Sequence, residues 1–179
     1  KNTNSPFPLG CQSLNDGWFA TNAMVHAGDA ETYPAAWWAR ELNINGYDDW
    51  YIPARDELEL CWRNLKPTSD ANYTSANKPS IQLYNYQIDG AYGDVSDQHG
   101  VNNNSYPAGN AYTGGSPSQT SVTAFRAGGN EAFNYGSYWY WSSTEYNTHY
   151  AWGQYHPGGQ YNTVKYNTYS MRVVRRVII

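Results

Sequence analysis

The sequence contains little charge. Only 15% of its 179 residues are Asp, Glu, Lys or Arg, and 11 basic against 15 acidic side chains give a net charge of −4. Domains that bind nucleic acids usually carry a marked excess of basic residues, so this composition argues against such a partner. The mean hydropathy is −0.76, so apolar residues do not replace the missing charge.

Long apolar runs and cysteines are also scarce. No stretch approaches the 18 apolar residues that suggest a membrane-spanning helix, and neither end carries an apolar signal segment, so we expect no membrane insertion. The only cysteines are Cys11 and Cys61. They allow one disulfide at most, and the sequence leaves open whether they pair or remain two buried thiols.

Motifs of common enzyme and metal sites are absent. Walker, dinucleotide-binding, zinc-protease and nucleophile-elbow patterns do not occur, and the histidines lack metal-ligand spacing. Asp89, Asp94 and Asp97 lie in a Gly-rich stretch but do not follow the EF-hand pattern. A glycosidase pair could still be assembled from distant residues such as Glu131 and Glu145, although no local pattern favours it. We therefore expect no cofactor, no metal and no catalytic activity.

The first part of the chain carries the helical signals. Apolar residues recur at helical spacing over residues 33–43 and 53–66, which predicts two helices. Residues 46–53, between them, predict a turn that leads into a short strand. Glu57 and Glu59 of the second helix are expected to face water.

The middle part, residues 67–130, predicts a long irregular insert. It holds eight of the 16 glycines, contains neither Trp nor Glu, and shows no lasting periodicity. The alternative is a set of short strands that the pattern does not resolve. With this insert the chain is expected to form one domain over residues 1–179.

The last part returns to strand signals. Alternation predicts a strand over 138–143. The turn signal Pro157-Gly158-Gly159 predicts a hairpin between strands over 150–156 and 161–166. Residues 171–179 are the most apolar segment of the chain, which predicts a central strand of the sheet.

Tyrosine and asparagine are concentrated in residues 133–170. This stretch holds nine of the 18 tyrosines together with four Asn, but only two charged residues, Glu145 and Lys165. Tyr supplies large, rigid contact area at low entropic cost, and Asn, Ser and Thr adapt their hydrogen bonds, so the composition favours a binding surface. Tyr and Thr also favour strands, but strands disfavour Asn.

Two sequence elements carry a family resemblance. Gly46-Tyr-Asp-Asp-Trp-Tyr-Ile-Pro53, followed by Asp56-Glu-Leu58, is the first, and Tyr140-Trp-Ser-Ser-Thr-Glu145, followed by Ala151-Trp152 and Arg172-Val-Val-Arg175, is the second. Together they resemble the C-type-lectin-fold domains of bacterial and viral surface proteins, including the variable proteins of diversity-generating retroelements. The resemblance implies an α+β C-type lectin fold, with two helices packed on small antiparallel sheets and the two chain ends close together.

The resemblance also implies a diversified ligand-binding surface. In such systems adenines of a template are randomised on copying, and an Asn codon changed at its first two bases yields Tyr, Ser, Thr or His but not Trp, Glu, Gln, Lys or Met. Tryptophans 139, 141 and 152 and the Trp37/Trp38 helix would be scaffold. The ligand-binding residues would be Tyr138, Tyr140, Tyr146, Asn147, Thr148, His149, Tyr150, Tyr155, Tyr161, Asn162, Tyr166, Asn167, Thr168 and Tyr169.

The implied partner is a protein or glycan on a target cell, bound by a protein displayed on a virion, its tail or a cell surface. The Glu-Pro-Asn and Trp-Asn-Asp signatures of calcium-dependent animal lectins are missing, so calcium-mediated sugar binding is not implied. The related formylglycine-generating oxidases need cysteines in the C-terminal half, and this chain has none after Cys61. A fixed-sequence adhesin or glycan-binding module of the same fold remains the alternative.

Overall fold

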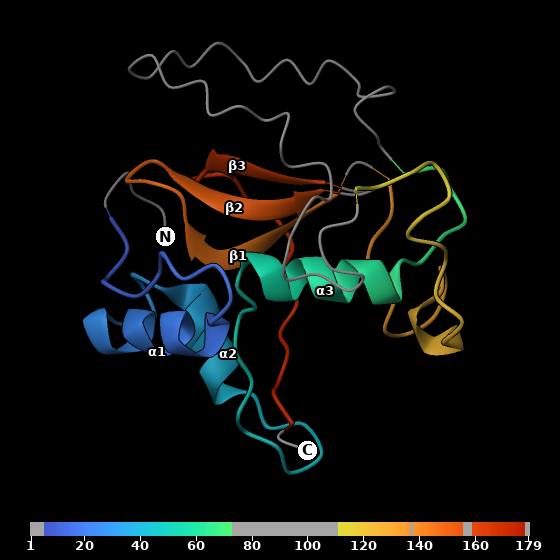
Figure 1. The fold of residues 1–179 in the computed structure, drawn as a ribbon. Helices are drawn as coiled ribbons and strands as arrows, with labels where there is room; N and C mark the ends of the chain where they lie inside the picture. The colour runs from blue at the N-terminus through green and yellow to red at the C-terminus, as the bar shows by residue number, and fades with distance from the viewer. Residues whose placement is uncertain (1–5, 73–110, 137, 156–158, 178–179) are drawn as a thin grey trace, which may run out of the picture.

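The computed structural model describes residues 6–72, 111–136, 138–155 and 159–177. These residues form an α+β structure in which three helices precede a three-stranded antiparallel sheet (Figure 1). None of the described helices has the length and apolar character needed to cross a membrane. The elements are α1 (Gly17–Ala27), α2 (Pro34–Glu41), α3 (Arg55–Leu65), a 3-10 helix (Thr123–Phe125), β1 (Trp139–Glu145), β2 (Tyr150–Tyr155) and β3 (Gln160–Val164).

Both predicted helices are confirmed. Helix α2 starts at a proline, which suits a first turn, and α3 carries Asp56 and Glu57 in its own first turn. Sequence reasoning did not single out α1, because its buried stripe consists of Gly17, Ala20, Thr21 and Met24. Apart from Met24, small or polar residues thus make the buried face of this helix, and its hydrophobic pattern is weak.

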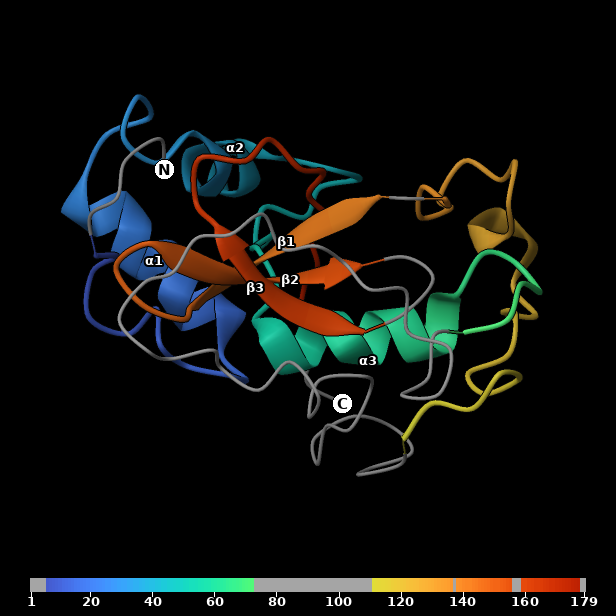
Figure 2. The same ribbon diagram turned by 90° about the horizontal axis from the view of Figure 1, so that it is seen from above.

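The three predicted strands are also confirmed, in the order β1-β2-β3. Trp139 pairs with Tyr155, and Gly153 pairs with Tyr161, so the register fixes which side chains share a face. Of the predicted turn Pro157-Gly158-Gly159, residues 157 and 158 lie outside the described part of the chain. Seen from above, α2 and α3 lie on opposite sides of the strands (Figure 2).

The prediction of a central C-terminal strand is wrong for the described residues, which end at 177. Val174 forms an isolated bridge with Tyr51. The short strand predicted after the turn within 46–53 is reduced to this bridge, and Tyr47 forms a second isolated bridge with Ile44 across the turn itself. The physical reason is that the C-terminal segment contains three arginines, which a central strand would bury. In the structure each arginine instead pairs with a carboxylate from a different part of the chain. These ion pairs are Arg172–Glu131, Arg175–Asp49 and Arg176–Glu57.

Two hydrophobic clusters hold the elements together. The first contains Cys11 and residues of α1 and α2, and the second joins α3 to Tyr140 of β1. Cys61 packs against the second cluster, and both cysteines are free thiols. Burial raises the pKa of Cys11 to about 12 and that of Cys61 to about 11, so both thiols stay protonated at neutral pH.

Helix α2 places its two tryptophans differently. The ring N–H of Trp37 donates to the carbonyl of Gly28 at 2.8 Å, and the side chain packs against the first cluster. Trp38 is 47% exposed. The resemblance implies that the helix with Trp37 and Trp38 is scaffold, and of these two side chains Trp37 is the one that packs against the core.

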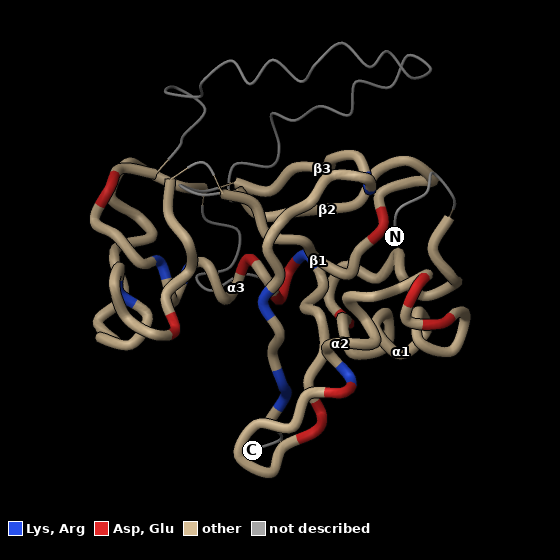
Figure 3. Tube along the Cα trace, turned by 180° about the vertical axis from the view of Figure 1, so that it is seen from behind, with Lys and Arg blue, Asp and Glu red and all other residues tan. Residues whose placement is uncertain are grey.

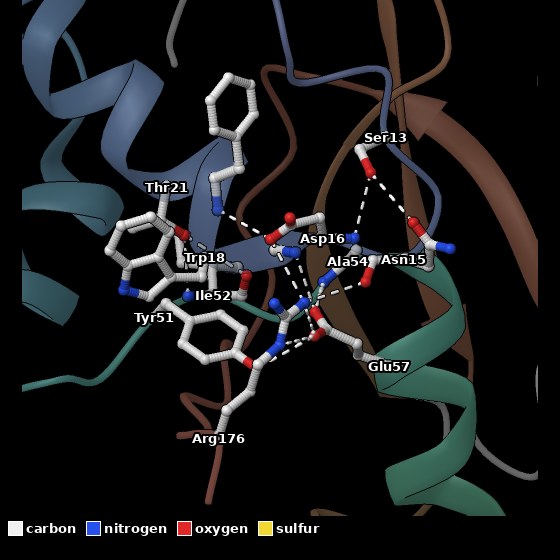
Figure 4. A network of polar contacts seen from close by, with 12 residues as sticks. Ser13, Asn15, Asp16, Trp18, Thr21, Tyr51, Ile52, Ala54, Glu57 and Arg176 are labelled. Atoms are coloured by element: carbon white, nitrogen blue, oxygen red, sulfur yellow. Dashed lines mark hydrogen bonds and ion pairs between the residues drawn. The ribbon is translucent and has the colours of Figure 1, made fainter. Parts of the chain in front are cut away.

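The Glu57 carboxylate links four parts of the chain, contrary to the expectation that it faces water (Figure 4). One oxygen accepts hydrogen bonds from the backbone N–H groups of Gly17 and Ala54, both at 2.9 Å. The other accepts from the Tyr51 hydroxyl at 3.0 Å and from Arg176 at 2.7 Å. One side chain thus ties the start of α1 and the start of α3 to the C-terminal segment.

Glu59 is fully buried, again contrary to the expectation that it faces water. Its carboxylate accepts from Arg63 at 2.8 Å, and the Tyr112 hydroxyl lies 2.8 and 2.9 Å from its two oxygens. Burial raises the pKa of Glu59 to about 7, although Arg63 and Tyr112 favour its charged form. The carboxylate anchors the described part of the insert to α3, since Tyr112 follows the undescribed residues 73–110.

The backbone of Gly17 lies close to the backbone of residues 52–54, and this close packing leads to a prediction. A Cβ atom at this position would lie 2.3 Å from the Ile52 carbonyl oxygen and 2.4 Å from the Ala54 nitrogen, both of which are backbone atoms. We expect Gly17→Ala to lower the free energy of unfolding by about 2–3 kcal/mol, measured by urea denaturation. Gly114→Ala is the control because its Cβ would meet nothing within 4 Å, and equal losses in both variants would contradict this account.

The raised pKa of Glu59 leads to a prediction about pH. Between the ordinary value of 4.5 and about 7 the folded protein holds a proton that the unfolded chain releases. The free energy of unfolding should therefore fall as the pH rises through this window, by at most about 1.4 kcal/mol per pH unit. In Glu59→Gln this slope should disappear from denaturation curves recorded from pH 4 to 8. An unchanged slope would show that another group causes it.

Candidate functional site

The Tyr-rich part of the chain forms the sheet, the β1–β2 turn (residues 146–149) and the segment that follows β3 (residues 165–170). Of the 14 predicted site residues, 12 reach the surface at least in part. Tyr138, Tyr146, Asn147, Thr148, Tyr166 and Thr168 are exposed, whereas His149, Tyr150, Tyr155, Asn162, Asn167 and Tyr169 are half-buried.

The other two predicted site residues, Tyr140 and Tyr161, are core residues. They are 5% and 2% exposed. The Tyr140 ring lies 4.9 Å from that of Phe133, and its hydroxyl oxygen accepts the Asn134 N–H at 2.6 Å. We therefore remove both from the candidate surface. The strand pleat and the packing of each sheet face decide which tyrosines are buried and which reach the surface, and the Tyr-rich composition alone does not show this.

Hydrogen bonds inside the β1–β2 turn hold its backbone. The Asn147 side-chain oxygen accepts from the N–H groups of His149 and Tyr150 at 2.9 and 3.0 Å. The Tyr150 carbonyl in turn accepts the N–H groups of Tyr146 and Asn147. Asn147 is thus a turn-forming residue. The Tyr146 ring lies edge-on to Trp152, with 5.6 Å between centroids.

A buried ion pair lies beneath this turn. The Lys165 ammonium donates to the Glu145 carboxylate and, at 2.9 Å, to the Thr148 carbonyl. The Lys165 backbone N–H donates to the His149 carbonyl at 3.0 Å. Glu145 also accepts the Phe7 N–H at 2.6 Å. The pair therefore connects the turn to β1, to the end of β3 and to the N-terminal segment.

An aromatic cluster, formed by Trp139, Trp141, Tyr155, Tyr161 and Tyr169, covers one face of the sheet. Tyr169 stacks on Trp139 with 5.4 Å between ring centroids and lies 4.9 Å from Trp141. Tyr155 lies 4.9 Å from Trp139. The segment after β3 therefore crosses the sheet and presents Tyr169 beside two tryptophans.

Polar contacts fix Tyr169 within this cluster. The Asn167 amide donates to the Tyr169 hydroxyl at 2.7 Å and to Thr163 at 3.0 Å. The Thr163 and Tyr169 hydroxyls lie 3.0 Å apart. Sequence reasoning did not include Thr163, although it shares a sheet face with Tyr161.

The turn and the segment after β3 adjoin each other, because Lys165 binds the turn and Tyr166 follows it directly. Residues 146–149, Tyr155 and residues 166–169 form the candidate binding surface, called the binding surface below. Strand alternation instead directs Tyr150 and Asn162 to the opposite face, which also carries Trp152 and Gln154. Tyr138 precedes β1 and does not contact the aromatic cluster in any described interaction.

The binding surface is electrically neutral. Residues 133–170 contain only Glu145 and Lys165 as charged residues, and both are buried. Other charged positions gather along the helices, the described part of the insert and the C-terminal segment (Figure 3). Arg55 lies 5.0 Å above the Trp152 ring and pairs with Asp56. The surface therefore presents aromatic faces, hydroxyls and amides to the solvent.

Metal coordination finds no support in the part of the chain that the structure describes. Those residues include no group of three or more His, Cys, Asp and Glu side chains that could hold an ion. Asp89, Asp94 and Asp97 lie outside the described residues.

Comparison with known proteins gives no match. No model of a protein family, no curated protein and no solved structure is similar enough to the chain to match it. The function therefore has to be argued from the residues of the binding surface and the contacts beneath it.

The contrast between exposed and buried tyrosines leads to a prediction. Tyr161→Ala should lower the free energy of unfolding by about 3–5 kcal/mol, because it removes a buried ring beside Trp139. Tyr166→Ala should change it by no more than about 0.5 kcal/mol, because Tyr166 is 51% exposed. Urea denaturation of both variants measures the difference. A large loss for Tyr166→Ala would place that ring in the scaffold.

Proposed function

We propose that this chain is a non-enzymatic binding protein that recognises a macromolecular ligand through the binding surface. The observation that carries the proposal is the arrangement of polar side chains: uncharged Tyr, Asn, Thr and His side chains gather on a backbone whose supporting charges, Glu145 and Lys165, are buried. Tyr and Trp supply rigid contact area, and hydroxyls and amides supply adaptable hydrogen bonds.

We also propose that the fold is of the C-type lectin type and that the chain is a variable protein of a diversity-generating retroelement. The two sequence elements of the resemblance contact each other in the structure, which supports this proposal. Ser143 donates its N–H to the Pro53 carbonyl at 2.9 Å. The Thr144 hydroxyl oxygen accepts the Arg55 N–H at 2.9 Å. The two elements thus behave as one structural unit.

The proposed ligand is a protein or glycan on a target cell, and the protein would act from a virion, its tail or a cell surface. A neutral surface suits a ligand region without strong charge, because charged groups would lose water on binding without gaining a partner. Aromatic faces and amides also suit sugars. A fixed-sequence adhesin or glycan-binding module therefore remains the second candidate.

The glycosidase alternative receives no support from Glu145. A catalytic acid or nucleophile must reach the substrate, whereas the Glu145 carboxylate is buried and accepts from Phe7, Gln12 and Lys165. Glu131, the other residue of the possible pair, is exposed and lies near Arg172.

Population sequencing tests the proposed function without knowledge of the ligand. We expect genes from many individuals to differ at exposed binding-surface positions such as Tyr146, Thr148 and Tyr166. The differences should occur only at bases where a nearby near-copy repeat has an adenine. A gene for a reverse transcriptase should accompany that repeat. Trp139, Glu145, Trp152, Gln154 and Lys165 should stay constant, since randomising Asn codons cannot produce Trp, Glu, Gln or Lys.

The buried Tyr140 and Tyr161 serve as internal controls in the same alignment. We expect them to stay aromatic, because the core requires their rings. A 3′ end that is invariant in every isolate, with no repeat near it, would contradict diversification. That outcome would favour a fixed adhesin, and a glycan array would then be the direct assay.

A further inference from the structure

A cavity of about 70 Å³ lies between the first helices and the sheet. Met24 of α1 and Ala36 of α2 form one side of it, together with Ile52. Ala151 of β2 and Trp141 of β1 form the opposite side. The lining is thus mainly apolar, and an apolar cavity of this kind favours an apolar occupant.

Both methionines of the chain line this cavity. Met24 lies in α1 and Met171 lies in the C-terminal segment, and the sequence contains no other methionine. Methionine side chains are flexible and polarisable, so they adapt to occupants of different shape and occur often at adaptable binding sites. Two residues 147 positions apart thus bring the same adaptable side chain to one place.

The cavity adjoins the aromatic cluster. Trp141 lines the cavity, and its ring lies 4.9 Å from that of Tyr169. Met171 also lines the cavity and follows Ser170, which is bonded to β1. Ala35 is both a lining residue and exposed, so the cavity reaches the protein surface beside α2.

Size and polarity define the occupant. A cavity of roughly 150 Å³ accommodates benzene, so about half that volume suits three or four carbon atoms. Lys165 lines the cavity too, but its ammonium is bound by Glu145 and the Thr148 carbonyl. An anion would have to displace those contacts, whereas a hydrocarbon group would not.

We propose that this cavity is an apolar subsite that takes a branched aliphatic side chain, of valine or leucine, from a bound protein. This inference rests on the proposed function and selects a protein ligand over a glycan, because sugars carry no such hydrocarbon group. The aliphatic side chain would act as the buried anchor of the interface, with the neutral aromatic cluster and polar turn around it.

The two methionine methyl groups provide the test. Protein labelled with ¹³C at the methionine methyls gives one NMR signal each for Met24 and Met171, assigned with Met24→Leu and Met171→Leu. Titration with N-acetyl-leucinamide should shift both signals saturably, whereas N-acetyl-glycinamide, which lacks the side chain, should shift neither. Equal shifts from the two amides would overturn the proposal.

Variants of two alanines separate cavity binding from contact elsewhere. Ala36→Val adds methyl groups to the buried wall, and Ala35→Leu covers the surface side and carries little risk to folding because Ala35 is exposed. Both variants should abolish the leucinamide shifts. Ala27→Val is the matched control, since Ala27 is exposed at the end of α1 and does not line the cavity. Shifts that persist in Ala35→Leu and Ala36→Val would overturn the proposal.

Xenon distinguishes an accessible subsite from a closed packing void. If xenon shifts the two methyl signals but leucinamide does not, the cavity is closed to side chains and the proposal fails. Population sequencing decides the proposed function independently of these titrations. An invariant gene with leucinamide binding intact would leave the apolar subsite in place on a protein-binding adhesin.

Discussion

The Glu145–Lys165 ion pair is the contact on which the presentation of the binding surface depends. Removing two charges from water costs several kcal/mol for each, so such a pair stabilises only when hydrogen bonds satisfy its remaining groups. Here Phe7 and Gln12 donate to Glu145, and Thr148 accepts from Lys165. The turn therefore gains its position from these buried groups and backbone atoms, together with the side-chain oxygen of Asn147.

Carboxylates also join distant segments at the helices. Glu57 accepts N–H groups at the starts of α1 and α3, and Glu59 holds Tyr112 against α3. A chain with few charged residues thus places three carboxylates where they join segments that are distant in sequence. This placement also explains the neutral binding surface, because the charges of residues 133–170 are used inside the protein.

Sequence patterns predicted the elements of this fold better than their long-range contacts. Periodicity identified α2 and α3, alternation identified β1, and the turn signal Pro157-Gly158-Gly159 identified β2 and β3 as a hairpin. Sequence patterns missed α1, whose buried face has only Met24 as a large apolar residue. They also misjudged the last segment, whose arginines reach separate carboxylates. Composition located the candidate surface but could not place Tyr161 in the core, since only the strand register shows which neighbours a side chain meets.

Under the proposed function, the asparagines of the binding surface differ in how freely they can change. Asn147 accepts two backbone N–H groups, so Asp, Ser or Thr could retain the acceptor, whereas an apolar residue would leave the turn without it. Asn167 instead donates its amide to the Thr163 and Tyr169 hydroxyls, and a carboxylate there would require both hydroxyls to turn and donate, which would break their contact with each other. Tyr166 and Thr168 are exposed residues that flank Asn167. Diversification of this surface would thus be broad at Tyr166 and Thr168 and restricted at Asn147 and Asn167, each by a different hydrogen-bonding requirement.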